Sequence, residues 1–185
     1  GVPLKTLLNE AGLKSNAKWL LLEGGDSAAM TRSLPLEQAL DDSLVAYRMN
    51  GEMLYPENGY PVRMVIPGWE ANMWVKWLRR IEVGDQPWHT REETSKYADL
   101  MPDGKSRQFT LVMEAKSVIT RPSGEMKIEQ RGFREITGLA WSGLGKITRV
   151  EISLDGGRTW ADAQLQQPVF AKAHTRFRFP WKWQG

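Results

Sequence analysis

The sequence predicts an α+β fold built in two parts. Helix-like and strand-like patterns alternate through residues 1–110, whereas short strand patterns separated by glycine and proline turns fill residues 111–185. The length of 185 residues suits one large domain or two small ones. We therefore expect a mixed α/β domain over residues 1–110, followed by a β-sandwich over residues 111–185.

The first predicted elements are a short amphipathic helix and a buried strand. Residues 2–12 have apolar positions at helical spacing, a proline near the first turn and a glycine just past the end. Residues 18–23 form an apolar run that stops at a Gly-Gly turn. Ser33 is expected to cap a second short helix that reaches Leu40.

Three further strands are predicted before the polar segment. They cover residues 44–49, residues 59–68 with alternating apolar side chains, and residues 74–83. Residues 84–105 are polar and rich in charge, so we expect a long excursion here rather than a sheet element.

The second part reads as a series of short strands. Residues 149–154 alternate strictly between polar and apolar side chains, and the Asp-Gly-Gly turn at residues 155–157 predicts a hairpin whose glycines adopt positive φ. Strands are predicted at residues 109–113, 116–120, 135–141, 147–154 and 177–183.

Composition and charge exclude several classes of protein. The formal net charge of +3 comes from interspersed charges, which disfavours a nucleic-acid footprint. No apolar stretch approaches the roughly 18 residues that a bilayer crossing needs. The chain has no cysteine and only two histidines, so it holds no disulfide, thiolate metal site or histidine zinc site of its own. The ends of the sequence suggest an excerpt of a longer protein.

Three charged residues stand out as candidates for contact with a bound ligand. Arg63 lies on a mostly apolar strand, where a cation needs an anion or carbonyl partner. A salt bridge and a bound phosphate explain Arg63 equally well. Lys76 lies among bulky apolar neighbours, where a snorkelling surface lysine is the simpler explanation. Asp26, which follows a Gly-Gly pair, could accept hydrogen bonds from a ligand or only close an Asx turn.

The remaining polar candidates are weaker when taken alone. Tyr97 lies beside a lysine in the polar segment, where a phenol could contact an oxyanion but is more often a surface residue. His89 and His174 have no partner that would make either a catalytic base. The sequence contains no dinucleotide fingerprint, phosphate loop, nucleophile elbow or metal-ligand cluster. The residues alone thus indicate an anion-binding domain joined to a β-sandwich.

Longer motifs resemble the sulfite oxidase family of molybdenum enzymes, and within it the molybdenum subunits of bacterial sulfane dehydrogenases. These motifs extend over most of the chain in the order and spacing of the family. The matching segments are Ala46–Gly51, Glu52–Asn58, Asn58–Arg63, Pro67–Gly68, Trp69–Asn72, Val75–Leu78, Ala140–Gly143 and Val150–Trp160.

The resemblance implies a partial molybdopterin-binding domain followed by a partial immunoglobulin-like dimerisation domain. It assigns the pterin and its phosphate to charge-assisted contacts with the cations of the Gly-Tyr-Pro-Val-Arg and Val-Lys-Trp motifs. Asn58 stands where the family commonly has a histidine that touches the cofactor. The cofactor-binding residues implied in this way are Asp26, Asn58, Arg63, Trp74, Val75 and Lys76.

The resemblance also implies a reaction and a place in the cell. Tyr97 falls on the active-site tyrosine of the family, beside the metal and the substrate. The implied reaction is oxygen transfer to sulfite or to carrier-bound sulfane sulfur, with electrons passing to the haem of a c-type cytochrome subunit. The implied partners are this cytochrome, a sulfur-carrier protein or small sulfur oxyanion, and a second copy bound through the β-sandwich, in the periplasm and without nucleic acid or membrane.

The absence of cysteine separates this chain from the pattern of the family. The family binds molybdenum through a cysteine thiolate, which no residue here replaces at equal strength. We expect that ligand outside residues 1–185, and we expect the polypeptide alone to be inactive. Two alternatives stay open: a dimerisation or interaction module without cofactor, and a nitrate reductase-type molybdenum domain, which shares the Arg63 and Lys76 motifs.

Overall fold

The computed structural model describes residues 1–184 and divides into two compact units. The first runs from Gly1 to Leu111 and the second from Val112 to Gly185. Each unit has its own hydrophobic core.

Two three-stranded antiparallel sheets form the frame of the first unit. One has the order β3-β2-β8, with β2 at its centre, and the other has the order β1-β4-β7. The strands of the first sheet are β2 (Trp19–Gly24), β3 (Thr31–Pro35) and β8 (Leu78–Gly84). The strands of the second are β1 (Val2–Pro3), β4 (Leu44–Ala46) and β7 (Arg63–Val65).

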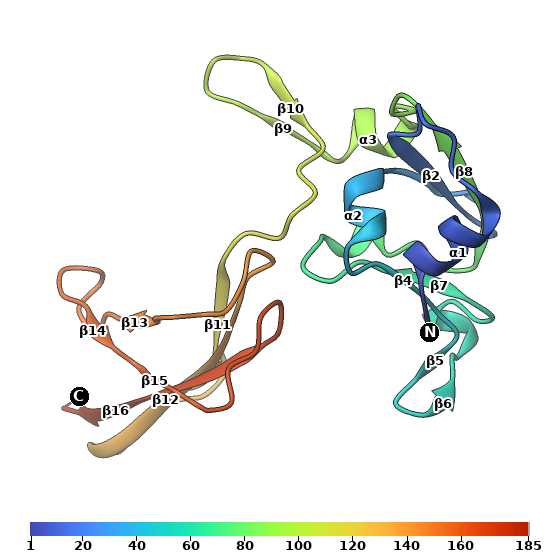
Figure 1. The fold of residues 1–185 in the computed structure, drawn as a ribbon. Helices are drawn as coiled ribbons and strands as arrows, with labels where there is room; N and C mark the ends of the chain where they lie inside the picture. The colour runs from blue at the N-terminus through green and yellow to red at the C-terminus, as the bar shows by residue number, and fades with distance from the viewer. Residues whose placement is uncertain (185) are drawn as a thin grey trace. The chain divides into compact units, whose positions relative to one another are not determined.

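Short helices and two small hairpins complete the first unit. Helices α1 and α2 pack against each other, and α2 also contacts β2, as Figure 1 shows. The helices are α1 (Leu4–Ala11), α2 (Leu36–Leu40), α3 (Arg91–Ser95) and the single 3₁₀ turns η1 (Pro56–Asn58) and η2 (Ala71–Met73). The hairpins pair β5 (Arg48–Met49) with β6 (Glu52–Met53), and β9 (Ala98–Leu100) with β10 (Ser106–Gln108).

The core of the first unit explains why the apolar positions recur as they do. Helix α1 buries Leu4 and Leu8, one turn apart, and ends where Gly12 takes a φ of +79° and donates its N–H to the Leu8 carbonyl. The buried side chains of this core come from both sheets, from α1, α2 and η2, and from the irregular chain on either side of η2. The core residues are Leu4, Leu8, Leu20, Leu22, Leu34, Ala39, Met64, Ile66, Trp69, Met73 and Val75.

Several sequence predictions for the first unit differ from the structure. The strand predicted over residues 59–68 is reduced to β7, the one over residues 44–49 is interrupted between β4 and β5, and the one over residues 74–83 begins only with β8. Ser33 does not cap a helix, because it lies inside β3, and α2 begins after Pro35 without a side-chain cap. The buried hydroxyl of Ser33 instead donates to Glu93 Oε2 at 3.0 Å. The polar segment 84–105 is not free of sheet structure, because it contains α3 and β9, and β9 pairs with β10 just beyond it. A Thr90–Glu93 capping box begins α3.

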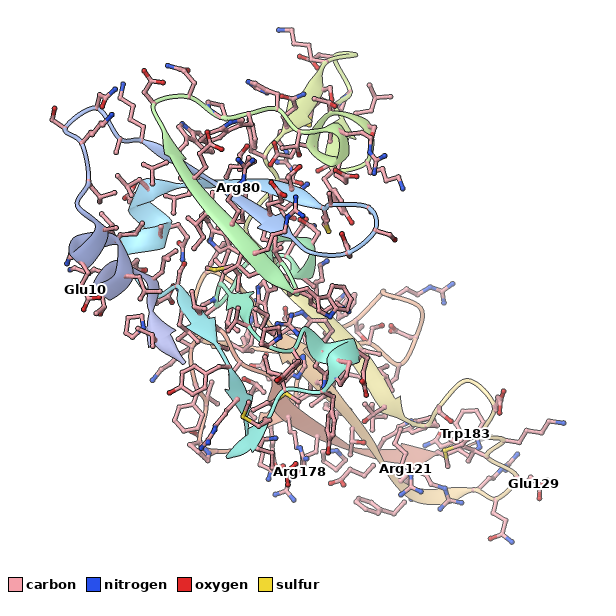
Figure 2. All side chains as sticks on the ribbon, turned by 90° about the vertical axis from the view of Figure 1, so that its right-hand side faces the viewer. Glu10, Arg80, Arg121, Glu129, Arg178 and Trp183 are labelled. Carbon is pink, nitrogen blue, oxygen red and sulfur yellow. The ribbon has the colours of Figure 1, made fainter. Side chains whose placement is uncertain are left out.

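The second unit is built on a four-stranded antiparallel sheet with the order β11-β12-β16-β15. Its two long strands pair from Gly132↔Trp183 to Ala140↔Thr175. A separate hairpin pairs β13 with β14. The strands are β11 (Lys116–Arg121), β12 (Gly132–Trp141), β13 (Glu151–Ile152), β14 (Ala161–Asp162), β15 (Gln164–Leu165) and β16 (Thr175–Trp183). Figure 2 labels Arg121 at the end of β11 and Arg178 on β16.

The strand predictions for the second unit hold for the long strands and fail for two others. Residues 109–113 do not form the predicted strand, and the strand predicted over residues 147–154 is reduced to Glu151–Ile152. The predicted Asp-Gly-Gly turn is confirmed, with φ of +73° at Gly156 and +87° at Gly157. The buried core of this unit is smaller than that of the first and consists of Ile136, Ala140, Ile152 and Phe177.

The helices of residues 1–184 are too short or too polar to span a membrane.

Candidate cofactor site

Two glycines bring three loops of the first unit into contact around Lys76. A Cβ atom at Gly24 would lie 2.9 Å from the Lys76 carbonyl oxygen, and one at Gly59 would lie 2.9 Å from Lys76 Cβ. Gly59 also has a φ of +102°, which an L side chain rarely adopts. Gly25 donates its N–H to the Trp77 carbonyl at 2.7 Å. Only glycine allows the backbone to approach so closely here.

Asp26 follows this glycine pair and is held by a local hydrogen bond. Its Oδ1 accepts the Met30 N–H at 3.0 Å, while the Met30 carbonyl accepts the Gly24 N–H at 2.9 Å. This turn fixes one oxygen of the carboxylate. The turn and the predicted ligand role are compatible, because a carboxylate has further lone pairs with which to accept N–H groups from a bound molecule.

Three side chains donate to three consecutive carbonyl oxygens of η1. Arg63 Nη1 donates to Asn58 O at 3.0 Å, Lys76 Nζ to Glu57 O at 2.8 Å, and Trp77 Nε1 to Pro56 O at 2.8 Å. Pro56 O also accepts the Gly59 N–H at 3.0 Å, and cations are favourable at the carbonyl end of a helical turn. The two predicted phosphate-binding cations are thus held by neighbouring carbonyl oxygens of η1.

Arg63 is half-buried and has no carboxylate partner. Its Nη2 donates to the Trp74 carbonyl at 3.2 Å, and its Cζ lies 5.9 Å from the centre of the Trp74 ring. Burial lowers the pKa of Arg63 from its ordinary value. Within residues 1–184 neither Arg63 nor Lys76 forms an ion pair. The partners of both cations are thus backbone carbonyl oxygens, and no carboxylate among the described residues neutralises either charge.

The structure gives a different environment to each of three predicted cofactor-binding residues, Trp74, Val75 and Asn58. The indole Nε1 of Trp74 is buried and has no hydrogen-bond partner among the described residues, so a ligand could accept from it. Val75 is 2% exposed, its side chain lies in the core, and its carbonyl accepts the Met64 N–H at 2.8 Å. Asn58 reaches the site through its backbone carbonyl.

Tyr97 lies just beyond the end of α3 and contacts a buried arginine that the sequence analysis did not single out. Its backbone N–H donates to Glu92 O at 3.1 Å, and its ring lies 4.6 Å below the Cζ atom of Arg32. Arg32 Nε also donates to the sulfur of Met73 at 3.2 Å. Met73 precedes Trp74, so this arginine joins Tyr97 to the loop that carries the Arg63 contact.

The sequence offered two signals for this connection. Arg32 is a charged residue in the middle of a strand of otherwise uncharged residues, and Thr90 and Glu93 have the spacing of a capping box. His89 and His174 take no part in the site: His89 lies 3.2 Å from the Gln108 side chain, and His174 packs edge-on against Trp141.

Comparison with known proteins identifies the family. Residues 1–92 match the oxidoreductase molybdopterin binding domain, and residues 107–183 match the Mo-co oxidoreductase dimerisation domain. The chain belongs to the molybdopterin oxidoreductases of the sulfite oxidase family. The resemblance inferred from the motifs is thereby confirmed, as is the α+β fold with an immunoglobulin-like second domain.

Solved and curated relatives place the chain within this family. The crystal structure of the sulfane dehydrogenase SoxCD from Paracoccus pantotrophus matches with a TM-score of 0.95 and 53% identity, over 100% of this chain and 48% of that chain. Rat mitochondrial sulfite oxidase is 34% identical over 100% of this chain and 36% of its own length. The NADH nitrate reductase of Solanum lycopersicum is 36% identical over 99% of this chain and 23% of its own length. The chain thus spans less than half the length of these relatives.

The residues of the first unit fit the anionic part of a molybdopterin. A phosphate suits the two cations that have no carboxylate partner. A heterocycle that accepts hydrogen bonds suits the buried indole N–H and the glycines where the loops cross. The metal itself is a different matter, because the chain has no cysteine and residues 1–184 hold no cluster of three or more metal-ligating side chains. The described residues therefore suit the organic part of the cofactor, and they offer no thiolate for the metal.

Proposed function

We propose that the complete protein containing this chain oxidises sulfite or carrier-bound sulfane sulfur and passes the electrons to a c-type cytochrome subunit in the periplasm. The single observation that carries the cofactor assignment is a pair of cations without carboxylate partners, Arg63 and Lys76, held by neighbouring carbonyl oxygens of η1. The choice of sulfur as substrate is supported by 53% identity to a sulfane dehydrogenase over the whole chain. The β-sandwich would mediate self-association.

The first unit contributes binding and orientation to this reaction. Arg63 and Lys76 would hold the phosphate of the cofactor, Asp26 would accept N–H groups of the pterin, and Trp74 Nε1 would donate to it. When bound, the molybdenum cofactor supplies the exchange of oxygen and two electrons. Tyr97 would lie beside the substrate, where its hydroxyl could donate to or accept from a sulfur oxyanion.

The cofactor assignment is tested by retention of pterin in the complete protein. We expect Arg63→Gln and Lys76→Gln each to lower the pterin content, measured by fluorescence after release, because each removes a charge-assisted contact to phosphate. Molybdenum, measured by elemental analysis, should fall in parallel. The matched control is Arg107→Gln, which removes an exposed arginine of β10 paired with Asp99. Unchanged pterin in both site variants would contradict the assignment.

Nitrate reduction is the second candidate function. It is favoured by the 36% identity to a plant nitrate reductase over 99% of the chain. Turnover of nitrate by the purified protein, in the absence of turnover of sulfite or of a carrier-bound persulfide with cytochrome c as acceptor, would replace the sulfur proposal. Both candidates use the same cofactor site, so the pterin measurement is independent of this choice.

A further inference from the structure

Arg32 is a buried cation whose hydrogen-bonding capacity is poorly used. It is 2% exposed, lies in the middle of β3, and forms no ion pair within residues 1–184. Its Nε donates to the weak sulfur acceptor of Met73, and its buried Nη1 has no hydrogen-bond partner among the described residues. A buried donor without a partner is unfavourable, so the arrangement of Arg32 calls for another stabilising contact.

The nearest buried carboxylate does not hold Arg32 directly. Glu93 is 1% exposed, and its oxygens accept hydrogen bonds from the Ser33 N–H, the Ser33 hydroxyl at 3.0 Å and the Thr90 N–H at 2.9 Å. Burial lowers the pKa of Arg32, while the charge of Glu93 acts in the opposite direction. Glu93 therefore balances the charge of Arg32 without fixing its side chain.

The contact that remains is the one with the ring of Tyr97. The guanidinium carbon lies 4.6 Å from the ring centre, within the range of a cation–π interaction, which is stronger in a desolvated site than on a surface. The backbone around this pair is also fixed. The Ser33–Glu93 hydrogen bonds and the Thr90 Oγ1 bond to Thr31 O at 3.0 Å join β3 to α3, and Tyr97 follows α3 closely.

We propose that Arg32 is a positioning residue that fixes the ring of Tyr97, and thereby directs the phenol hydroxyl toward the sulfur substrate. The inference rests on the proposed function, because it assumes that Tyr97 acts at the substrate. Arg32 does not itself contact the substrate in this account. Its effect on turnover passes through the phenol, which distinguishes it from a residue that only stabilises the fold.

A double-mutant comparison in the complete holoenzyme tests this dependence. We expect Arg32→Met to lower kcat about ten-fold, with KM for sulfite and pterin content unchanged, because a freed ring places its hydroxyl less often in the productive position. In a Tyr97→Phe background, which has no hydroxyl to direct, the same substitution should lower kcat by less than about two-fold. Equal losses in the two backgrounds would overturn the proposal. Arg32→Lys keeps a buried cation but loses the planar group, and its loss of kcat should likewise be smaller in the Tyr97→Phe background.

A spectroscopic measurement tests the positioning without relying on turnover. With 3-fluorotyrosine introduced at position 97, we expect the ¹⁹F resonance to shift and to average in Arg32→Met, and to keep its position in the control Arg107→Met. An unchanged resonance in Arg32→Met would also overturn the proposal. The proposed function fails separately, through loss of sulfite turnover or pterin in the unsubstituted protein, whereas the positioning role fails with both intact.

Discussion

Tyr97 can be tested directly because its hydroxyl is separable from its packing. The ring rests against Arg32 and the backbone N–H is bonded to Glu92 O, and neither contact uses the hydroxyl. Tyr97→Phe should therefore fold normally and slow sulfur oxidation about ten-fold or more, the scale of one positioned proton or hydrogen-bond partner. Steady-state turnover in the complete enzyme provides the measurement, and thermal unfolding serves as the control. Turnover equal to that of the unsubstituted enzyme would remove Tyr97 from the site.

Asp155 gives the second unit a dependence on acidic pH. Its Oδ2 accepts the Thr159 hydroxyl at 2.7 Å, and its Oδ1 accepts the N–H groups of Thr159 at 2.9 Å and Arg158 at 3.0 Å. The hydrogen bond from the Thr159 side chain is the largest of the causes that lower the pKa of Asp155 from 3.8 to about 2. The carboxylate therefore stabilises the folded state above pH 3.8.

This stabilisation should be lost as the pH falls from about 3.8 toward 2. We expect the melting temperature of the second unit to drop across this interval, and Asp155→Asn to reduce the drop because an amide does not titrate. Unfolding followed by the nuclear magnetic resonance signals of the Arg158 and Thr159 amides, which donate to Asp155, reports on this region. Parallel pH profiles for the two proteins would contradict the prediction.

For single residues, the sequence showed which side chains are unusual in their surroundings, but not which residues they contact. Arg63 and Lys76 could be singled out because a cation among apolar neighbours is unusual, and the structure gives neither a carboxylate partner within residues 1–184. The role of Ser33 could not be inferred, because its partner Glu93 lies 60 residues away and no local pattern shows which pairs a fold brings together. The local signal at Arg32, a charge in a strand of otherwise uncharged residues, likewise could not show that Tyr97 is its partner.

At the scale of elements, strand ends rather than strands make the site. The strand predicted over residues 74–83 begins only at Leu78, and the residues before it form an irregular loop in which Trp77 has a φ of +50°. Periodicity showed apolar side chains there but could not show that Gly24 and Gly59 approach the same backbone. Close approach between distant loops is a tertiary property, which explains why the first residues of a predicted strand form an irregular loop instead.

Gly59→Ala tests the crossing of these loops. The new Cβ would lie 2.9 Å from Lys76 Cβ and 3.1 Å from Lys76 Cα, so Lys76 must move. We expect a fall in pterin content together with a destabilisation of about 1–2 kcal/mol from the positive φ alone. Gly51→Ala is the matched control, since Gly51 also has a positive φ, +85°, but its Cβ would meet nothing within 4 Å. The control should lose stability without losing pterin, and equal pterin loss in both would contradict the crowding argument.

At the scale of the whole molecule, all the residues assigned to the cofactor lie in one of the two units. Asp26, Arg63, Lys76 and Tyr97 belong to the unit Gly1–Leu111, while the match to a dimerisation domain covers residues 107–183. The sequence changes near residue 110 from mixed helix and strand patterns to short strand patterns separated by turns, and such a change can be recognised without a structure. Because the residues assigned to the cofactor and the dimerisation-domain match lie in different units, we expect that cofactor binding and self-association can be impaired separately.

Gly138→Ala provides the substitution for the second unit. Gly138 lies in β12 opposite Phe177 of β16, and a Cβ there would overlap the Phe177 ring and the Val118 carbonyl. Overpacking of this kind costs about 1–3 kcal/mol, enough to lower the melting temperature of a small domain by about 5 °C or more. Gly145→Ala is the control, because its Cβ would meet nothing within 4 Å and no positive φ opposes it.

The two units can then be separated by measuring two properties on the same variants of the complete protein. Gly138→Ala should weaken self-association, measured by sedimentation, and leave the pterin content per folded chain unchanged. Arg63→Gln should do the opposite, because its contacts with Asn58 and Trp74 lie wholly within the first unit. If Gly138→Ala removed pterin as effectively as Arg63→Gln, cofactor binding would depend on the assembled protein, and the cations of the first unit would not be sufficient to explain it.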